Sequence, residues 1–345
     1  MEQLKVLILS EAEFETSTEE VMDCLLQLGA LPLRLNGEDL DSRGATVRFE
    51  ICEGNANARL WIEDKELQLN EVQAVWYRRW VRNRQHEVVD LLDSAHANAG
   101  RLHYAIKRHL TLESRRLSSF LFSRLAGVPW LSDPEKASIN KLHVLEVASK
   151  VGLATPATLI TSERQEVRRF SDLYGLLITK PMGEVEILIE GENVHFMFTP
   201  IIDREAIDAL PERFTPSLFQ EWIEKDFELR IFYIDGDCYA MAIFSQLNPQ
   251  SQADFRRQDF TRPNRYVPYR LSSETTDRVR RLMEKLGLDT GSLDLIRMPG
   301  GREVFLEVNP IGQFGMVSKP CNYQLERRMA EALIRRATYG QGSRQ

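Results

Sequence analysis

An α/β (α+β) chain with several subdomains is the fold class that the sequence predicts, for three reasons. Residues 1–80 alternate short apolar runs with one helical pattern, as in a small α/β unit. The later apolar runs are separated by turn residues, which predicts hairpins and a meander. At 345 residues, the chain also exceeds what one hydrophobic core usually serves. We expect domains at residues 1–127, 128–215 and 216–345.

The first 80 residues contain most of the expected N-terminal elements. A helix is predicted at residues 18–28 by apolar residues three and four positions apart. Strands are predicted at residues 5–10, 31–35, 45–52, 58–63 and 73–78. The last strand runs into the motif VWYRRW, which places aromatic and basic side chains at a strand end. Such ends are common places for ligand contacts, and a plain edge of amphipathic side chains fits the motif equally well.

Helical patterns dominate the next part of the chain. Apolar residues at three- and four-residue steps predict a long helix within residues 85–125, followed by a boundary near Val128. Asp133 and Pro134 have the residue types of a helix start, and we expect this second helix to carry Lys141. Considered alone, Lys141 has the features of an ordinary surface lysine.

Two strand regions follow the second helix. Lys180 ends an apolar strand at residues 176–180, and a lysine at the end of a buried strand points toward a cleft. Residues 184–200 have the pattern of a hairpin with one apolar and one acidic face. An ordinary half-buried hairpin explains this pattern, and so does an edge to which an extended peptide adds as a further strand.

Residues 217–234 have the composition of an adenosine site. Two strand patterns flank a polar interruption that begins at Glu221–Ile223. The backbone groups and apolar wall of this run, with the carboxylate of Glu228, are what an adenosine needs. Arg230 follows in the second strand. A plain meander with charged loops has the same pattern.

A polar segment at residues 245–266 contains Asp254 and Arg256 beside a second arginine. Such a segment is usually a solvated loop. Convergent arginines are also how proteins stabilise phosphoryl charge, so a catalytic loop is the alternative.

Residues 292–308 have the pattern of two strands around a glycine-containing turn. Because side chains alternate along a strand, Glu307 and Asn309 share one face while Leu306 takes the other. An even-numbered turn brings Asp294 to the face of Glu307, whereas an odd-numbered turn would break this arrangement.

Asp294, Glu307 and Asn309 would together supply three hard oxygen donors. This is the ligand set that Mg²⁺ prefers when it also holds phosphates. When the hairpin is considered alone, three polar residues on a wet sheet face explain the pattern equally well. Helices are expected on both sides of the hairpin, at residues 274–286 and 322–336, with a frayed tail from residue 339.

Charge and cysteine content argue against several classes of protein. The formal net charge of −7 disfavours broad binding to nucleic acid or to an anionic membrane. The N-terminus lacks the basic start, apolar core and cleavage site of a signal peptide, and no apolar run approaches a membrane span. The four cysteines have no CxxC spacing, which predicts reduced thiols and a cytoplasmic protein.

Five short motifs in this order resemble those of the ATP-grasp superfamily. They are Asn140-Lys141, Lys180-Pro181, Gln220-Glu221, Glu228-Leu229-Arg230 and Glu307-Val308-Asn309. Within that superfamily the chain is most similar to the ligases that macrocyclise ribosomally made peptides, the graspetide or microviridin-type maturases. The segments VWYRRW and FLEVNPIGQFGMVSKPCNY carry this resemblance, and the second is similar to the grasp-with-spasm branch.

The resemblance implies an ATP-grasp fold, in which an N-terminal α/β domain precedes central and C-terminal domains that sandwich ATP. The ATP-binding residues would be Lys141 and Lys180 at the phosphates, Glu221, Trp222 and Ile223 at the adenine, and Glu228 at the ribose. The ligands of Mg²⁺ would be Asp294, Glu307 and Asn309. Arg230 and Arg256 would lie near the transferred γ-phosphoryl group, and Asp254 would lie close to the nucleophile.

The resemblance also implies a reaction and a partner. The enzyme would activate Asp or Glu side chains of a precursor peptide as acylphosphates and join them to Ser, Thr or Lys side chains of the same peptide. A leader segment of the precursor would guide this reaction, and a homodimer is expected. Two other functions fit the same nucleotide site: a carboxylate–amine ligase that joins two separate molecules, and a peptide-binding protein that is gated by nucleotide but no longer catalytic.

Overall fold

The computed structural model describes residues 3–12, 15–40, 45–52, 55–62, 65–80, 100–183, 188–190, 193–195, 199–246 and 263–342. The chain divides into two compact units, one made of Met1–Pro134 with Gln324–Gln345 and the other of Glu135–Tyr323. Within the described ranges, no helix is long and apolar enough to cross a membrane.

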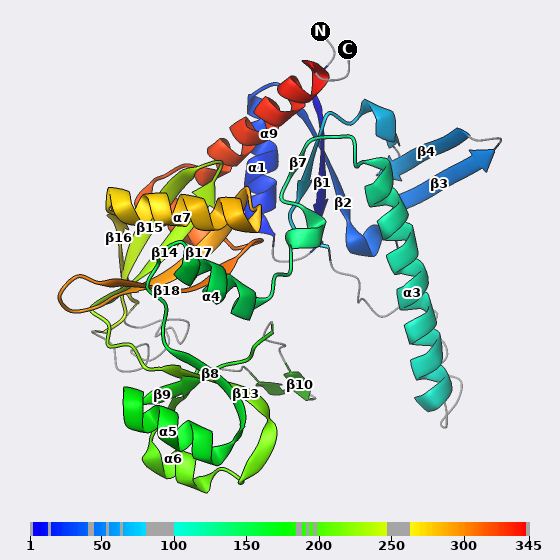
Figure 1. Cartoon of the computed structure of the whole chain (residues 1–345). Coiled ribbons are helices and arrows are strands. Elements are labelled where there is room, and N and C mark those ends of the chain that lie inside the picture. The colour runs from blue at the N-terminus through cyan, green and yellow to red at the C-terminus, as the bar shows by residue number, and fades with distance from the viewer. Residues whose placement is uncertain are drawn as a thin grey trace. The chain divides into compact units, whose positions relative to one another are not determined.

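A parallel sheet with the strand order β2-β1-β6-β7 forms the centre of the first unit (Figure 1). Its strands are β1 (Lys5–Ser10), β2 (Leu31–Asn36), β6 (Ala74–Tyr77) and β7 (Trp130–Leu131). The side chains of β1 are buried from Val6 to Ser10. Such a continuous buried run is typical of a parallel strand that is covered on both faces.

Helices and a small antiparallel sheet complete the first unit. The helices are α1 (Thr16–Gln27), α3 (Gly100–Arg124) and α9 (Leu325–Gly342), with short 3₁₀ turns η1 (Gly37–Leu40) and η2 (Leu69–Glu71). The antiparallel strands are β3 (Ala45–Cys52), β4 (Asn55–Ile62) and β5 (Lys65–Gln68). The C-terminal helix α9 packs against α1, β6 and β7, so the two ends of the chain build one core.

The second unit contains two larger sheets and a separate hairpin. The first sheet has the order β12-β9-β13-β8. Its strands are β8 (Thr158–Glu163), β9 (Leu177–Thr179), β12 (Ile201–Ile202) and β13 (Arg213–Glu221), and its helices are α5 (Arg164–Tyr174) and α6 (Arg204–Ala209). A small core that includes Val167, Ile207 and Phe219 lies between these helices and the sheet. The hairpin consists of β10 (Leu188–Glu190) and β11 (Asn193–His195).

The second sheet of this unit is antiparallel and has the order β16-β15-β14-β17-β18 (Figure 1). Its strands are β14 (Phe227–Ile234), β15 (Asp237–Phe244), β16 (Arg265–Tyr269), β17 (Thr290–Arg297) and β18 (Glu303–Asn309). Helices α4 (Lys141–Lys150) and α7 (Ser273–Leu286) bury one face of the sheet, where Val144 and Leu282 of the helices share a core with Phe305 of β18. The short helix α8 (Gly315–Cys321) contacts β14, β15 and β16. The 3₁₀ turn η3 (Pro134–Lys136) spans the start of the unit.

The pairing of β17 with β18 differs from the regular alternation that the sequence predicts. The loop between Arg297 and Glu303, which pair with each other, has an odd number of residues, and the register shifts between Asp294 and Leu295. The shift is a β-bulge in which Leu306 is the extra residue. The bulge compensates for the odd loop, so Asp294 still lies opposite Glu307.

The second predicted helix begins later than expected. Pro134 belongs to a 3₁₀ turn, and α4 begins at Lys141 because the side chain of Asn140 caps it. The Asn140 Oδ1 atom accepts hydrogen bonds from the amides of Leu142 at 2.9 Å and His143 at 3.3 Å. These bonds satisfy two of the amides that a helix start leaves unpaired.

The structure also differs from the expected domain boundaries and from the expected tail. Residue 215 lies inside β13 (Arg213–Glu221), so no boundary falls there. The last 22 residues belong to the first unit, because α9 completes its core and extends to Gly342. The tail that we expected to fray from residue 339 is therefore helical as far as Gly342.

Candidate active site

Residues from both large sheets of the second unit line one cavity of about 480 Å³. All ten predicted site residues within the described ranges lie on its wall: Lys141, Lys180, Glu221, Trp222, Ile223, Glu228, Arg230, Asp294, Glu307 and Asn309. The two other predicted residues, Asp254 and Arg256, lie outside the described residues. The cavity thus brings together groups that are up to 168 positions apart in the sequence (from 141 to 309).

The predicted metal ligands form the acidic floor of this cavity. Asp294 on β17 and Glu307 on β18 are directly opposite each other, and Asn309 is opposite Ser292. Arg230 on β14 donates to Asp294, with its Nη1 atom 2.6 Å from Oδ2. Both members of this ion pair are largely buried, with side-chain exposures of 11% and 19%. The guanidinium therefore neutralises one of the two carboxylates.

Lys141 neutralises the other carboxylate. Its Nζ atom lies 3.1 Å from Oε2 of Glu307. Because Asn140 sets the start of α4, Lys141 is the first residue of that helix and its side chain reaches the sheet. Its surroundings differ from those of an ordinary surface lysine.

The loop after β18 holds Asn309 in place. The Oδ1 atom of Asn309 accepts from the amide of Ile311 at 3.1 Å. Ser292 donates from Oγ to the carbonyl of Gln313 at 3.1 Å. This close approach needs a glycine at position 312, because a Cβ atom there would lie 2.2 Å from the Cβ atom of Ser292.

The donor set of the acidic floor suits Mg²⁺. Two carboxylates and one amide oxygen are hard ligands, and Oδ1 of Asn309 keeps a second lone pair beside its bond to Ile311. Among the described residues there is no group of three His, Cys, Asp or Glu side chains that could hold a metal ion. A Mg²⁺ site on this floor would therefore need Asn309 as its third protein ligand.

The predicted adenine hinge has one available amide. The amide of Glu221 donates to the carbonyl of Ala157 at 3.0 Å, and that of Trp222 donates to Leu176 at 2.9 Å. The amide of Ile223 bonds to none of the described residues. A bound base could therefore accept a hydrogen bond from Ile223 without breaking the sheet.

Glu228 is a buried carboxylate beside this hinge. Its Oε1 atom accepts a hydrogen bond from Nζ of Lys225, which is also buried. Burial raises the pKa of the Glu228 carboxyl above its ordinary value, and the Lys225 ammonium opposes this rise. The pair provides a hydrogen-bonding group on the cavity wall beside the apolar side chains of Ile223 and Leu229.

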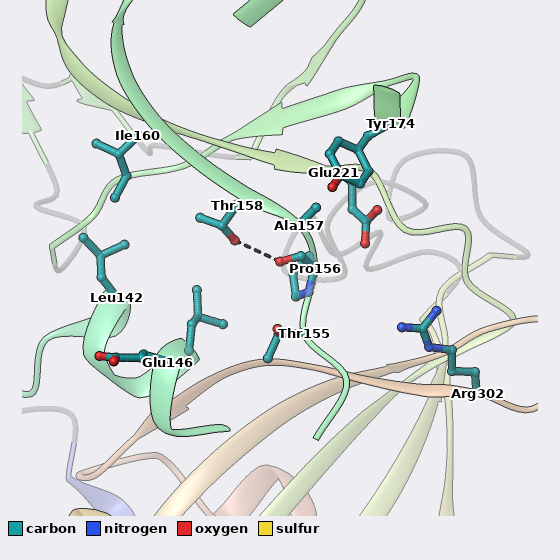
Figure 2. Close-up of a pocket in the computed structure, with 11 residues that line it drawn as sticks. Leu142, Glu146, Thr155, Pro156, Ala157, Thr158, Ile160, Tyr174, Glu221 and Arg302 are labelled. Carbon is teal, nitrogen blue, oxygen red and sulfur yellow. Dashed lines mark hydrogen bonds between the residues drawn. The ribbon is translucent and has the colours of Figure 1, made fainter. Parts of the chain in front are cut away.

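A second cavity, of about 630 Å³, lies beside the hinge and shares Pro156 and Glu221 with the first. Figure 2 shows its wall, with Thr158 donating to the carbonyl of Pro156 at 3.0 Å. Leu142 and Ile160 make part of this wall apolar. Glu221 is the only predicted site residue within the described ranges that lines this second cavity.

Comparisons with known proteins found similarity in both units of the chain. Residues 5–128 match the family model described as the MvdD pre-ATP grasp domain. No curated protein matches the chain. A RiPP-associated ATP-grasp ligase of Chryseobacterium gregarium, solved with ADP and a leader and core peptide, aligns with a TM-score of 0.79 and 23% identity over 96% of this chain and 95% of the other.

Two further solved structures show the same fold. The macrocyclase MdnC of Microcystis aeruginosa MRC, bound with the precursor peptide MdnA, aligns with a TM-score of 0.77 and 25% identity over 96% of this chain and 100% of the other. The ATP-grasp ligase PsnB, complexed with a precursor variant, Mg and ADP, has a TM-score of 0.70 and 20% identity over 96% and 98% of the two chains.

The chain has an ATP-grasp fold. The resemblance to ATP-grasp macrocyclases is thereby confirmed, and the N-terminal α/β unit corresponds to a pre-ATP-grasp domain. In this ATP-grasp chain the cavity lies between the two sheets that the fold brings together.

Leu306 and Lys225 are among the cavity residues that the sequence analysis did not predict. Leu306 lines the cavity with Glu307, although regular alternation predicted that it would face away. The bulge turns both side chains to one face, and no local signal in the sequence predicts a bulge. Lys225 was also missed, although a lysine in the polar interruption three residues before Glu228 could have indicated a counter-ion.

Proposed function

We propose that this protein is an ATP- and Mg²⁺-dependent ligase that macrocyclises a ribosomally made precursor peptide. The observation that carries the proposal is the single cavity in which two lysines, an open hinge amide and a carboxylate–carboxylate–amide set converge. The printed descriptions of the similar structures, a ligase and a macrocyclase with precursor peptides, support the choice of substrate.

Each side of the cavity has a proposed role in binding ATP. The amide of Ile223, with the backbone of Glu221 and the indole of Trp222, would hold the adenine. Glu228 would accept hydrogen bonds from the ribose hydroxyls, since its carboxylate is fixed by Lys225. Lys180 and Lys141 would bind the phosphates as point charges.

Asp294, Glu307 and Asn309 would hold Mg²⁺, which when bound would offset the phosphate charge that repels an attacking carboxylate. Lys141 is paired with Glu307 before nucleotide binds, so it would exchange one oxygen partner for another. Arg230 would remain on Asp294 and face the transferred phosphoryl group. Arg256 would also lie near that phosphoryl group and Asp254 close to the nucleophile; both lie outside the described residues.

The proposed reaction has two steps within the cavity. A substrate Asp or Glu carboxylate attacks the γ-phosphorus of ATP, which forms an acylphosphate and releases ADP. A Ser or Thr hydroxyl, or a Lys amine, of the same peptide then displaces phosphate and forms an ester or an amide. Positioning and fixed charges accelerate both steps, and exclusion of water prevents hydrolysis of the acylphosphate. A leader segment bound at the β10–β11 hairpin would retain the peptide.

The mass of the peptide tests the proposal. A short peptide encoded next to this protein and rich in Thr, Ser, Asp and Glu should lose one water per crosslink when incubated with the protein, ATP and Mg²⁺. Release of ADP with no change in peptide mass would contradict macrocyclisation. A mass gain on a separate acceptor would indicate a ligase that joins two molecules.

Substitution of one metal ligand tests the site. Glu307→Gln should lower the rate of crosslinking roughly 100-fold or more, because a preorganised charge at the phosphates is lost. Glu284→Gln removes an exposed carboxylate from α7 and serves as the matched control. Equal rates for the two variants would show that Glu307 does not hold the metal.

A further inference from the structure

A basic cavity lies on the opposite side of the second sheet from the nucleotide cavity. Its volume is about 580 Å³. Four arginines line it, and together they are called the basic cup here: Arg270, Arg278, Arg297 and Arg302. Two glutamates, Glu274 and Glu303, also line it, which leaves a formal excess of two positive charges (four minus two). The chain as a whole has a net charge of −7, so this excess is a local departure.

The basic cup is separate from the proposed catalytic centre. Asp294 and Arg297 are three residues apart on β17, which is about 10 Å along a strand. Because side chains alternate, Asp294 and Ile296 face the nucleotide cavity, whereas Arg297 faces the α7 side of the sheet. A ligand in the cup would not occupy the ATP site.

Glu303 organises the inner wall of the cup. Its Oε1 atom accepts from the hydroxyl of Tyr269 at 3.1 Å and from Nη1 of Arg297 at 3.2 Å. Its Oε2 atom accepts from Oγ1 of Thr275 at 2.6 Å. Glu303 thereby occupies the hydroxyl and guanidinium donors of the inner wall.

Two of the arginines lie close over glycines. A Cβ atom at Gly301 would lie 2.9 Å from Nη2 of Arg297. At Gly152, which has a φ of +89°, a Cβ atom would lie 3.4 Å from Nε of Arg278. Both guanidinium groups therefore rest close against the backbone. Arg297 is paired with Glu303, and Arg278 is paired with Glu274 at 2.6 Å.

Arg270 and Arg302 are the open positions of the cup. Both are exposed, and neither forms an ion pair with any described residue. Arg270 follows β16 and Arg302 lies in the β17–β18 turn, so they stand on different walls. Arg302 also lines the partly apolar cavity beside the hinge (Figure 2). Arg302 therefore links the basic cup to the neighbouring cavity, whose wall includes the apolar side chains of Leu142 and Ile160.

We propose that the basic cup binds an acidic segment of the peptide substrate, with carboxylates on Arg270 and Arg302. Separate singly charged groups along an extended chain suit two separated arginines. A compact phosphate would place two charges close to Glu274 and Glu303, which repel it. Arginine binds carboxylates through paired N–H donors, so each contact adds orientation as well as charge. The inference rests on the proposed function for the identity of the peptide.

Fluorescence anisotropy with a fluorescein-labelled octaglutamate peptide tests the cup without nucleotide or precursor. The double variant Arg270→Ala/Arg302→Ala should bind this probe about fivefold more weakly than the wild type at low salt. The double variant Arg213→Ala/Arg281→Ala removes two exposed arginines of the same unit away from the cup and should bind it as the wild type does. Equal weakening in both double variants, or in neither, would overturn the proposal.

Two further measurements keep the test decisive. Displacement of octaglutamate by an equal concentration of inorganic phosphate would overturn the choice of a peptide. Circular dichroism checks folding, and the single charge reversal Arg302→Glu replaces the double variant if that variant unfolds. With precursor peptide, the Arg270→Ala/Arg302→Ala variant should raise KM for the peptide and leave KM for ATP unchanged. Arginine-dependent octaglutamate binding would support the cup even if no peptide lost water, so the two proposals can fail separately.

Discussion

Glu228 illustrates how a single side chain in the cavity depends on its surroundings. Its carboxyl is buried and is held by Lys225, which is only three residues away in the sequence. Burial favours the neutral acid, whereas the ammonium favours the carboxylate. The raised pKa of Glu228 shows that burial is the larger effect. The buried carboxylate of Glu228 is therefore destabilising, and its proposed role is to accept hydrogen bonds from the ribose hydroxyls.

The pH dependence of stability tests this balance. Between the ordinary pKa of 4.5 and the raised pKa, the folded protein keeps a proton that the unfolded chain has lost. The contribution of Glu228 to the free energy of unfolding must then fall as pH rises, by at most about 1.4 kcal/mol per pH unit. Glu228→Gln lacks this contribution. The wild type should therefore lose stability relative to the variant as pH rises above 4.5, in urea unfolding at several pH values.

The control for this measurement is Glu284→Gln, which changes an exposed carboxyl in the same unit. Its difference from the wild type should stay constant over the same pH range. A constant difference for Glu228→Gln as well would contradict the raised pKa.

At the scale of one element, the β17–β18 hairpin shows how two irregularities cancel. An odd loop alone would put Leu306 opposite Asp294, and the bulge instead brings Glu307 there. The bulge also turns Leu306 into the nucleotide cavity. The hairpin thereby supplies an acidic pair and an adjacent apolar contact from consecutive residues.

Leu306→Ala tests the apolar contact. Loss of this side chain should weaken binding of ATP with Mg²⁺ about tenfold in titration calorimetry, because the adenine ring would lose part of its apolar contact surface. The backbone bulge and the acidic pair remain. Leu173→Ala, which changes a leucine that is 77% exposed in the same unit, should bind ATP as the wild type does. Equal affinities in all three proteins would exclude Leu306 from the nucleotide contact.

At the scale of the whole molecule, the chain returns at its end to the unit in which it began. Leu325, Met329 and Leu333 of α9 are buried in the first unit. The pre-ATP-grasp match covers residues 5–128, so this unit needs a helix from outside the matched range. Its stability should therefore depend on the C-terminus.

Leu333→Ala should lower the free energy of unfolding of the first unit by about 2–5 kcal/mol, because it leaves a cavity in a packed core. Hydrogen exchange of the β1 and α1 amides would measure this loss in the first unit alone. Leu26→Ala is the matched control, since that leucine of α1 is 52% exposed. Unchanged protection of β1 in the Leu333→Ala protein would contradict the dependence on α9.

Local patterns in the sequence were enough to predict many elements. The predicted strands at residues 5–10, 31–35 and 45–52 are confirmed, as are the pairing of a hairpin within residues 184–200 and the helix that ends at Leu286. These features follow from residue periodicity and turn residues, which act over a few positions. The resemblance then selected ten described residues that line one cavity. Their roles remain proposals.

The remaining features depend on contacts between distant parts of the chain. The odd turn and the compensating bulge are set by pairing of whole strands, so alternation along one strand could not predict the position of Leu306. The start of α4 depends on the Asn140 cap, although Asp133 and Pro134 have equally suitable residue types. The place of α9 depends on which core buries its apolar face. The sequence by itself therefore determined most of the local elements. Long-range packing determined which side chains face the same cavity.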